Sequence, residues 1–246
     1  PTGRTEERGR GRALFAGGYA VPQAGAIKDI YYSQIETTGT TTQFGELSVA
    51  RWIPSSGASS TRGVFNGGGT PSRTDTIDFV TIATTSNATD FGDTTSARQV
   101  PAGASNQTRG IIAGGKSPAS NPAGVNTIEF ITIASTGNGQ DFGDLLATQA
   151  GHFGLSSPTR AIFAGGYTPA ATNVIQYVTI DTTGDATDFG DLTVARGGGA
   201  GGASNTRGLF FTGSDGSSLL NTIDFITIAT TGNASNFGDA VIARGE

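Results

Sequence analysis

The stretch Thr76–Thr85, TIDFVTIATT, returns at Thr222–Thr231 as TIDFITIATT, with one residue changed. Around these two copies, the same longer unit can be followed five times along the 246 residues. Self-similarity at a period of roughly 20–50 residues is typical of repeat architectures, in which each unit buries its apolar surface against its neighbours. The repeat therefore decides the fold class.

Four positions anchor each unit. They are an Arg before an apolar stretch and a Gly pair, an Ile that opens a strand, the Phe of a Phe-Gly pair, and a closing Arg or Gln. In chain order the members are Arg12, Arg62, Arg109, Arg160 and Arg207; Ile30, Ile77, Ile128, Ile175 and Ile223; Phe44, Phe91, Phe142, Phe189 and Phe237; and Arg51, Arg98, Gln149, Arg196 and Arg244.

The spacing between anchors is constant except in one segment. The Phe always lies 14 positions after the Ile, the closing residue 7 after the Phe, and the next Arg 11 after the closing residue. Only the segment from Arg to Ile varies, with lengths of 18, 15, 19, 15 and 16. Insertions confined to one loop of each repeat often mark a binding face. We predict such a face from the variable loops 19–29, 69–76, 116–127, 167–174 and 214–222.

The segments between the anchors have the residue types of β-strands. Ile77–Ile82, IDFVTI, is β-branched and aromatic and carries apolar groups on both alternating faces, so it needs cover on both. The Thr, Gly and Asn residues that follow favour a hairpin, and no segment shows helical periodicity. About four short strands per unit predict an all-β, five-bladed β-propeller. We expect one domain, 1–246, with approximate repeats 1–50, 51–97, 98–148, 149–195 and 196–246.

Residues 1–11 depart from the repeat. Glu6, Glu7, Arg8 and Arg10 stand where the other units have Gly, Ala and Ser. We predict an edge strand or a frayed arm here, with a contact to a neighbouring molecule as the alternative. The first and last units are expected to meet by face packing.

Composition excludes several functions. The chain has no Cys and a single His, which excludes a thiolate zinc site and argues against a multi-His metal centre. The net charge of −5 argues against binding nucleic acid by phosphate neutralisation, and nine of the 15 basic residues occupy the two Arg slots of the repeat. No apolar run is long enough to span a membrane. Neither a metal nor another cofactor is expected.

Recurring charged residues are predicted to be structural. A catalytic residue needs a unique partner, whereas an acid follows Phe-Gly in every unit. We expect these acids and the recurring Arg residues to bond turns and tie blades together. The predicted structural set is Arg62, Arg109, Arg160, Arg207, Asp93, Asp144, Asp191 and Asp239.

Two catalytic or cofactor interpretations are weak. The run 197–202 contains G-x-G-x-x-G, but a dinucleotide site needs a following helix, so we predict close packing at the propeller centre instead. The remaining acids form no distinctive carboxylate pair of the kind that glycosidases use. The sequence therefore predicts a protein that is not an enzyme.

Residues outside the repeat slots are the candidates for individual function. Trp52 and His152 follow closing residues, and we place them near the variable loops. Exposed aromatic rings beside amides and hydroxyls suit sugar stacking or a protein contact; a solvated loop or local packing is the alternative for each, especially for Tyr19 and Tyr167, which share a slot. The candidate set is Trp52, His152, Tyr19, Lys28, Arg73, Lys116, Tyr167 and Asp215.

The order of Arg, apolar strand, Gly-Gly, variable loop and aromatic strand resembles the kelch repeat. Gly17-Gly18, Gly67-Gly68, Gly114-Gly115 and Gly165-Gly166 match its double glycine. Thr212-Gly213 departs from it, and Phe replaces the usual Trp. The sequences of the strands, including Asp-Phe-Gly-Asp-Leu, more closely resemble those of kelch-like virion proteins of tailed phages such as cyanophages.

This resemblance implies a role in a phage particle. The expected function is a tail, tail-fibre or surface-decoration domain, in the virion or extracellular, that docks a neighbour or recognises a host surface. Its partners would be other virion or surface proteins and also host glycans, and a symmetric assembly would suit that role. The alternatives are a secreted lectin-like propeller and, third, a glycosidase with acids clustered at the axis.

Overall fold

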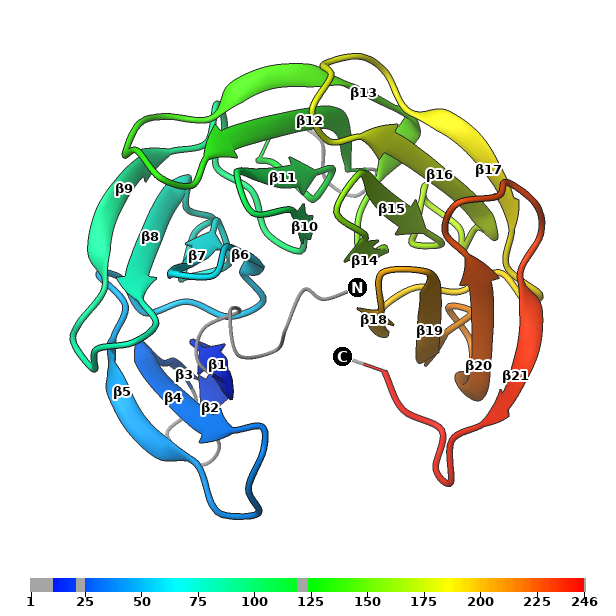
Figure 1. Cartoon of the computed structure of the whole chain (residues 1–246). Coiled ribbons are helices and arrows are strands. Elements are labelled where there is room, and N and C mark those ends of the chain that lie inside the picture. Colours follow the sequence, from blue (N-terminus) through cyan, green and yellow to red (C-terminus); the bar gives the residue numbers. More distant parts are fainter. Residues whose placement is uncertain (1–10, 21–24, 119–123, 246) are drawn as a thin grey trace.

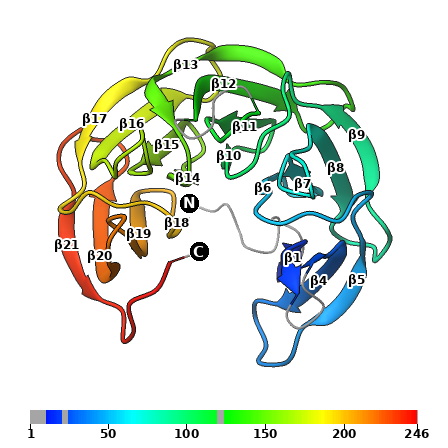
Figure 2. The same cartoon turned by 180° about the vertical axis from the view of Figure 1, so that it is seen from behind.

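The computed structural model describes residues 11–20, 25–118 and 124–245. Over these residues every regular element is a β-strand, and five antiparallel sheets stand as blades around a central axis (Figure 1; Figure 2 shows the other face). The predicted five-bladed β-propeller is confirmed. Blades are numbered 1 to 5 in chain order.

Blades 2 to 5 each have four strands, which lie side by side in chain order from the axis outward. The innermost strands are β6 (Ser55–Ala58), β10 (Ala102–Ser105), β14 (Phe153–Ser156) and β18 (Ala200–Ala203). The second strands are β7 (Arg62–Asn66), β11 (Arg109–Ala113), β15 (Arg160–Ala164) and β19 (Arg207–Ser214). The third strands are β8 (Thr76–Thr81), β12 (Val125–Thr132), β16 (Val174–Thr179) and β20 (Leu219–Thr227). The outer strands are β9 (Thr89–Asp93), β13 (Gln140–Gln149), β17 (Thr187–Asp191) and β21 (Ser235–Asp239).

Blade 1 has three strands within the described residues: β1 (Arg12–Ala16), β4 (Asp29–Gln34) and β5 (Thr42–Glu46). A short hairpin of β2 (Tyr19–Ala20) and β3 (Gly25–Ala26) lies in the loop between β1 and β4. Apart from Gly11, the predicted edge strand or arm at 1–11 lies outside the described residues.

The Phe-Gly motif forms a β-bulge in every blade. In blade 2, Ile77 pairs with Gly92 and Asp78 pairs with Asp90, so Phe91 is the extra residue of the outer strand. The same register shift occurs in the other four blades. Bulges redirect side chains, and Phe91 is 3% exposed in a cluster that includes Ile112 of blade 3. The bulge thus aims each such Phe at the next blade.

The hairpin of the next blade covers the glycine after this Phe. Gly137 of blade 3 donates its N–H to the carbonyl of Phe91 at 2.8 Å. A Cβ on Gly92 would lie 2.6 Å from the carbonyl oxygen of Gly137, which is shorter than a van der Waals contact. The close approach of two backbones therefore requires glycine at this position.

Apolar clusters lie between blades. One of them joins Ile162 and Phe189 of blade 4 to Phe210 and Ile226 of blade 5, each at most 3% exposed. Burying one such side chain contributes about 1.5–3 kcal/mol relative to leaving it exposed. Because every blade is apolar on both faces, each formed interface between blades is a core.

Glycines let the innermost strands meet near the axis. A Cβ on Gly103 would lie 2.3 Å from the carbonyl oxygen of Ser56, and the same clash would arise at Gly154 and Gly201 with the preceding blade, at 2.5 Å in both cases. Gly201 lies in β18 and no helix follows it. Gly201, in the run 197–202, thus packs the innermost strand as predicted, whereas Gly197 lies in the link between blades.

The expected face packing between the first and last units is wrong. Phe237 of blade 5 is 53% exposed, whereas its four equivalents are 2–3% exposed, and Phe15 on the facing side of blade 1 is 55% exposed. The described residues form no hydrogen bond, ion pair or aromatic contact between these blades. The ring in Figure 1 is open at this point. We call the two uncovered blade faces the open seam.

Candidate functional site

A buried latch joins each blade to the next. We define it as the side chain of a closing residue bonded to the side chain that follows the opening Ile of the next blade. Arg51 meets Asp78 at 2.8 Å, Arg196 meets Asp224 at 2.9 Å, and Arg98 pairs with Glu129. All six side chains are fully buried. Burial lowers the pKa of the Arg51 and Arg98 guanidinium groups, and the partner carboxylates oppose that effect.

The fourth latch is neutral on both sides. Gln149 replaces the closing Arg, and Gln176 replaces the acid and donates its amide to Gln149. Gln149 in turn donates to the carbonyl of Gly165 at 3.1 Å. Charge is therefore lost from both partners together, which keeps a lone ion out of the core. Sequence reasoning missed this acid slot, although the paired change to Gln was a signal for it.

The second recurring Arg also bonds across the blade interface. The guanidinium of Arg62 stacks over Phe79 at 4.5 Å and donates to the carbonyl of Ile133 in the next blade at 2.9 Å. Arg109 and Arg160 make the equivalent contacts with Ile180 and Ile228. These arginines tie blades together. Arg207 stacks over Phe225 only.

The acids after Phe-Gly lie where each outer strand meets the hairpin of the next blade. No ion pair joins Asp93, Asp144, Asp191 or Asp239 to a recurring Arg within the described residues. Instead, the backbone N–H of Asp93, Asp144 and Asp191 donates to the side-chain carbonyl or carboxylate oxygen of Asn138, Asp185 and Asn233, at 3.0–3.1 Å. These bonds join each outer strand to the hairpin of the next blade through the backbone of the acid.

The variable loops lie beside the links between blades. Isolated bridges pair link residues with loop residues: Trp52 with Gly69, Gln99 with Lys116, Ala150 with Tyr167, and Gly197 with Ser214. We call this side of the propeller the loop face. Residues 21–24 and 119–123 of the variable loops lie outside the described residues.

An aromatic pair stands on the loop face between blades 1 and 2. Tyr19 and Trp52 meet edge to face with ring centroids 5.7 Å apart, and Tyr19 is 56% exposed. The indole lies over Gly69, where a Cβ would come within 2.5 Å of it. Gly69 thus provides the surface on which Trp52 rests.

The equivalent tyrosine of blade 4 shows what Trp52 changes. Tyr167 meets Gly197, which occupies the slot of Trp52, and its hydroxyl reaches across to the carbonyl of Ser214 at 3.0 Å. Tyr167 is therefore a framework residue. In blade 1 the indole fills that space, so Tyr19 stays exposed and the two rings form a surface.

The backbone beside Trp52 is strained. Ile53 has φ 50° and Val100, in the same slot, has φ 59°, whereas the slot holds Gly151 and Gly198 in later blades. β-branched residues rarely adopt this left-handed conformation. Such strain is concentrated at functional sites. The strain at Ile53 therefore supports a functional role for the neighbouring Trp52.

The charged candidates are engaged locally. Lys28 forms an exposed ion pair with Glu46 at 2.6 Å, and this hydrogen bond raises the pKa of Lys28. Asp215 accepts the backbone N–H groups of Ser217 and Ser218 at 2.7 Å, and these bonds lower the pKa of its carboxyl. Arg73 and Lys116 form isolated backbone bridges with Gly69 and Gln99.

His152 is buried rather than exposed. It is 7% exposed, its ring meets Phe163 edge to face, and neither ring nitrogen has a hydrogen-bond partner. Burial lowers the pKa of His152 to about 4. The expectation that it contributes to an exposed binding face is wrong, because the glycines around it leave room for the ring to turn inward.

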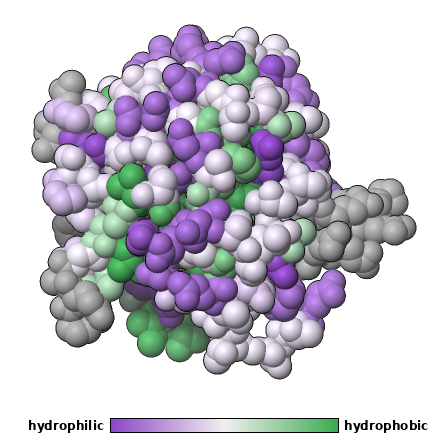
Figure 3. Space-filling view, turned by 90° about the vertical axis from the view of Figure 1, so that its left-hand side faces the viewer, coloured by the Kyte–Doolittle hydropathy of each residue, from purple (hydrophilic) through white to green (hydrophobic). Residues whose placement is uncertain are grey.

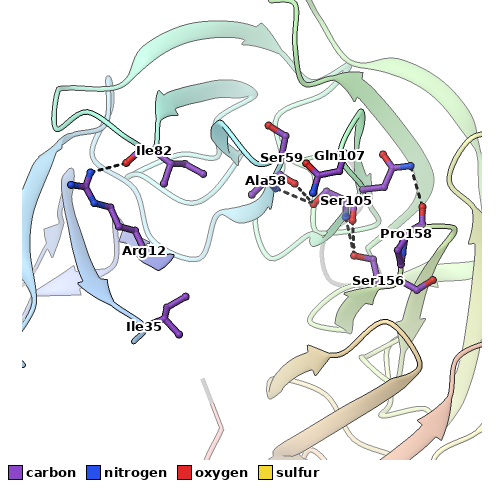
Figure 4. Close-up of a pocket in the computed structure, with 11 residues that line it drawn as sticks. Arg12, Ile35, Ala58, Ser59, Ile82, Ser105, Gln107, Ser156 and Pro158 are labelled. Atoms are coloured by element: carbon purple, nitrogen blue, oxygen red, sulfur yellow. Dashed lines mark hydrogen bonds between the residues drawn. The ribbon is translucent and has the colours of Figure 1, made fainter. Parts of the chain in front are cut away.

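A separate cavity of about 290 Å³ opens near the axis (Figure 4). Its wall comes from the turns between first and second strands, on the opposite side from the loop face, and includes Ser105, Asn106 and Ser156. These side chains already bond neighbouring blades: Ser156 donates to the Ser105 carbonyl at 2.7 Å. None of its 11 lining residues is Asp or Glu. Sequence reasoning did not single out this wall, because its residues resemble ordinary turn residues.

Replacing Gly69 tests the aromatic surface. We expect Gly69→Ala to push the indole of Trp52 outward, because the added Cβ occupies its position. Trp52 is the only Trp in the chain, so a red shift of the emission maximum would report the change directly. Gly39→Ala, where an added Cβ meets nothing within 4 Å, is the control and should leave emission unchanged. Equal spectra for both variants would contradict the described packing.

The fold and the latches define a β-propeller repeat protein with one aromatic surface on its loop face. No family model matches the chain, and no curated protein matches it. Within the described residues, no three His, Asp or Glu side chains gather as metal ligands, and no helix is long and apolar enough to cross a membrane.

Proposed function

We propose that this protein is a non-enzymatic binding propeller that uses its loop face. The repeated Arg and acid side chains are occupied in the framework between blades. The loops vary in length while the framework spacing is constant. Residue variation is therefore concentrated where a partner can be contacted without disturbing the core.

The Tyr19–Trp52 pair, with Tyr19 exposed and Trp52 partly exposed, is the observation that carries this proposal. Aromatic rings with one apolar face free bind sugar rings or apolar side chains, and Trp and Tyr dominate the energy of many interfaces. Lys28 and Glu46 supply charged hydrogen-bonding groups on the same blade. Such a surface suits a glycan or a polar protein face.

The resemblance to kelch-like phage virion proteins supports placing this binding in a virion. We propose that the loop face docks a neighbouring virion protein or recognises a host surface. A particle displays many copies of each component, so weak individual contacts can add by avidity. This setting would make a small aromatic surface sufficient.

Substitution at the pair tests the function. We expect Trp52→Ala and Tyr19→Ala each to weaken binding about thirtyfold, since loss of an aromatic hot-spot residue costs ~2 kcal/mol or more. Binding of labelled protein to a glycan array and to intact bacterial cells provides the measurement. Tyr31→Ala, which removes an aromatic side chain of strand β4 that is 37% exposed, is the matched control. Binding that survives both loop-face variants would refute the proposed surface.

A further inference from the structure

Blade 5 has the same residues that the other blades use to bind the next blade in the chain. Arg207 is the equivalent of the arginines that bond the next blade. Phe237 and Gly238 form the bulge, and Arg244 is the closing residue of the latch. In blades 1 to 4 the equivalent residues are all engaged with the next blade. We call these four residues the outward face of blade 5.

Within the described residues, the side chains of this outward face contact only their own blade, through Phe225. Arg244 is exposed, whereas the closing arginines Arg51, Arg98 and Arg196 are fully buried. Arg207 has no carbonyl of a next blade to bond, and Phe237 is 53% exposed. Val241 and Ile242 add further exposed apolar surface, at 99% and 63%. Figure 3 shows a mainly polar outer surface with a group of apolar atoms at its lower edge.

The backbone of the outer strand β21 is also shaped for a partner. A Cβ on Gly92, Gly143 or Gly190 would strike the backbone of the next blade's hairpin, at 2.5–2.6 Å. A Cβ on Gly238 would meet nothing within 4 Å. In the formed interfaces, that hairpin donates to the carbonyls of Phe91 and Asp93, whose blade 5 equivalents are Phe237 and Asp239. Blade 5 therefore presents acceptors for one more hairpin.

Blade 1 is a poor match for this face. A receiving blade elsewhere supplies an acid or Gln after its opening Ile, and an Asn or Asp in its hairpin. Blade 1 has Tyr31 and Thr40 in those two slots. Tyr31 offers no carboxylate to Arg244, and Thr40 lacks the side-chain carbonyl that accepts the outer-strand N–H. Closing the ring on blade 1 would bury a cation without its partner, which is costly.

We propose that the outward face of blade 5 is the docking site for a further β-blade of this same repeat type. That blade carries a carboxylate after its opening Ile and an Asn or Asp in its hairpin. The carboxylate pairs with Arg244, the Asx oxygen accepts the N–H of Asp239, and an Ile carbonyl accepts Arg207. The argument rests on continuity with the four interfaces already formed, three with an Arg–carboxylate latch and one with its Gln–Gln equivalent.

A sixth blade copied from the protein itself tests this. We would join residues 52–98 directly to Arg244 in place of Gly245 and Glu246, which keeps the spacing of 11 positions to the next Arg. Hydrogen exchange at residues 235–242 is the readout, because docking converts exposed outer-strand amides into buried ones. We expect exchange there to slow by about tenfold or more relative to the original chain.

The matched control carries Asp78→Tyr and Asn87→Thr in the appended copy, which gives it the two residues of blade 1. It should leave exchange at residues 235–242 close to that of the original chain. Equal protection by both copies, or a copied blade that stays protease-sensitive on the chain, overturns the proposal. So does concentration-dependent dimerisation of the original chain that protects the same amides in sedimentation and exchange experiments, because the occupant would then be a second copy.

Discussion

Asp224→Ala is expected to lower the free energy of unfolding by about 3–5 kcal/mol, the usual cost of leaving one member of a buried ion pair alone. Arg196 is fully buried and meets Asp224 at 2.9 Å, and Asp224 also accepts the N–H and hydroxyl of Thr193. In the variant, Arg196 would keep its bonds to the carbonyls of Thr212 and Phe210, but no carboxylate would balance its charge. Urea unfolding at neutral pH measures the loss.

The protein itself supplies a rescue for this variant. Gln149 and Gln176 form the same latch without charge, so the double variant Arg196→Gln with Asp224→Gln should recover most of the stability that either single variant loses. A remaining deficit of about 1–2 kcal/mol is expected, the scale of a few altered hydrogen bonds. A double-mutant cycle isolates the coupling. Strictly additive losses would show that the two side chains do not act as a latch.

An exposed pair serves as the control. Glu46→Ala removes the partner of Lys28, yet both side chains are substantially exposed, so water and salt already screen the attraction. Little change in the urea midpoint is expected. A loss as large as that of Asp224→Ala would show that burial is not what makes the latch important.

The blade architecture could be predicted because its determinants are local and repeated. The β-branched third strands, the Phe-Gly bulge and the constant spacings each report on backbone geometry within one blade. The confinement of length variation to one segment of each repeat also indicated where the variable loops lie, beside the links between blades. What spacing cannot report is how the ends of the series meet, since that depends on contacts between residues such as Phe15 and Phe237 that are far apart in the chain.

The site was predicted less well, for physical reasons. Trp52 and His152 look alike in sequence, since both follow a closing residue, yet one ring lies on the surface over Gly69 and the other turns inward against Phe163. The orientation depends on which glycines leave space around each ring. Likewise, Asp78 lies within an apolar strand sequence, and its role depends on its contact with Arg51, which is 27 residues away in the chain.

His152 makes stability depend on pH between the ordinary pKa of an imidazole and the lowered pKa of this buried ring. Its pKa is lowered from 6.5 to about 4 by burial, so the unfolded chain binds a proton before the folded chain does. Stability is therefore full above pH 6.5 and falls as pH drops toward 4. The shift corresponds to about 3 kcal/mol in total, of which roughly 2 kcal/mol is lost by pH 5.

His152→Leu isolates this effect, because the chain has only one His. We expect the variant to keep nearly constant stability between pH 7 and 5 in urea unfolding, where the original protein weakens. At neutral pH it should equal or exceed the original, since both ring nitrogens lack partners in the folded state and an apolar group of similar size removes that cost. A pH slope that persists in the variant would place the titration elsewhere. A steep loss of stability at pH 7 would instead show that the imidazole has a hydrogen-bonding role in the core.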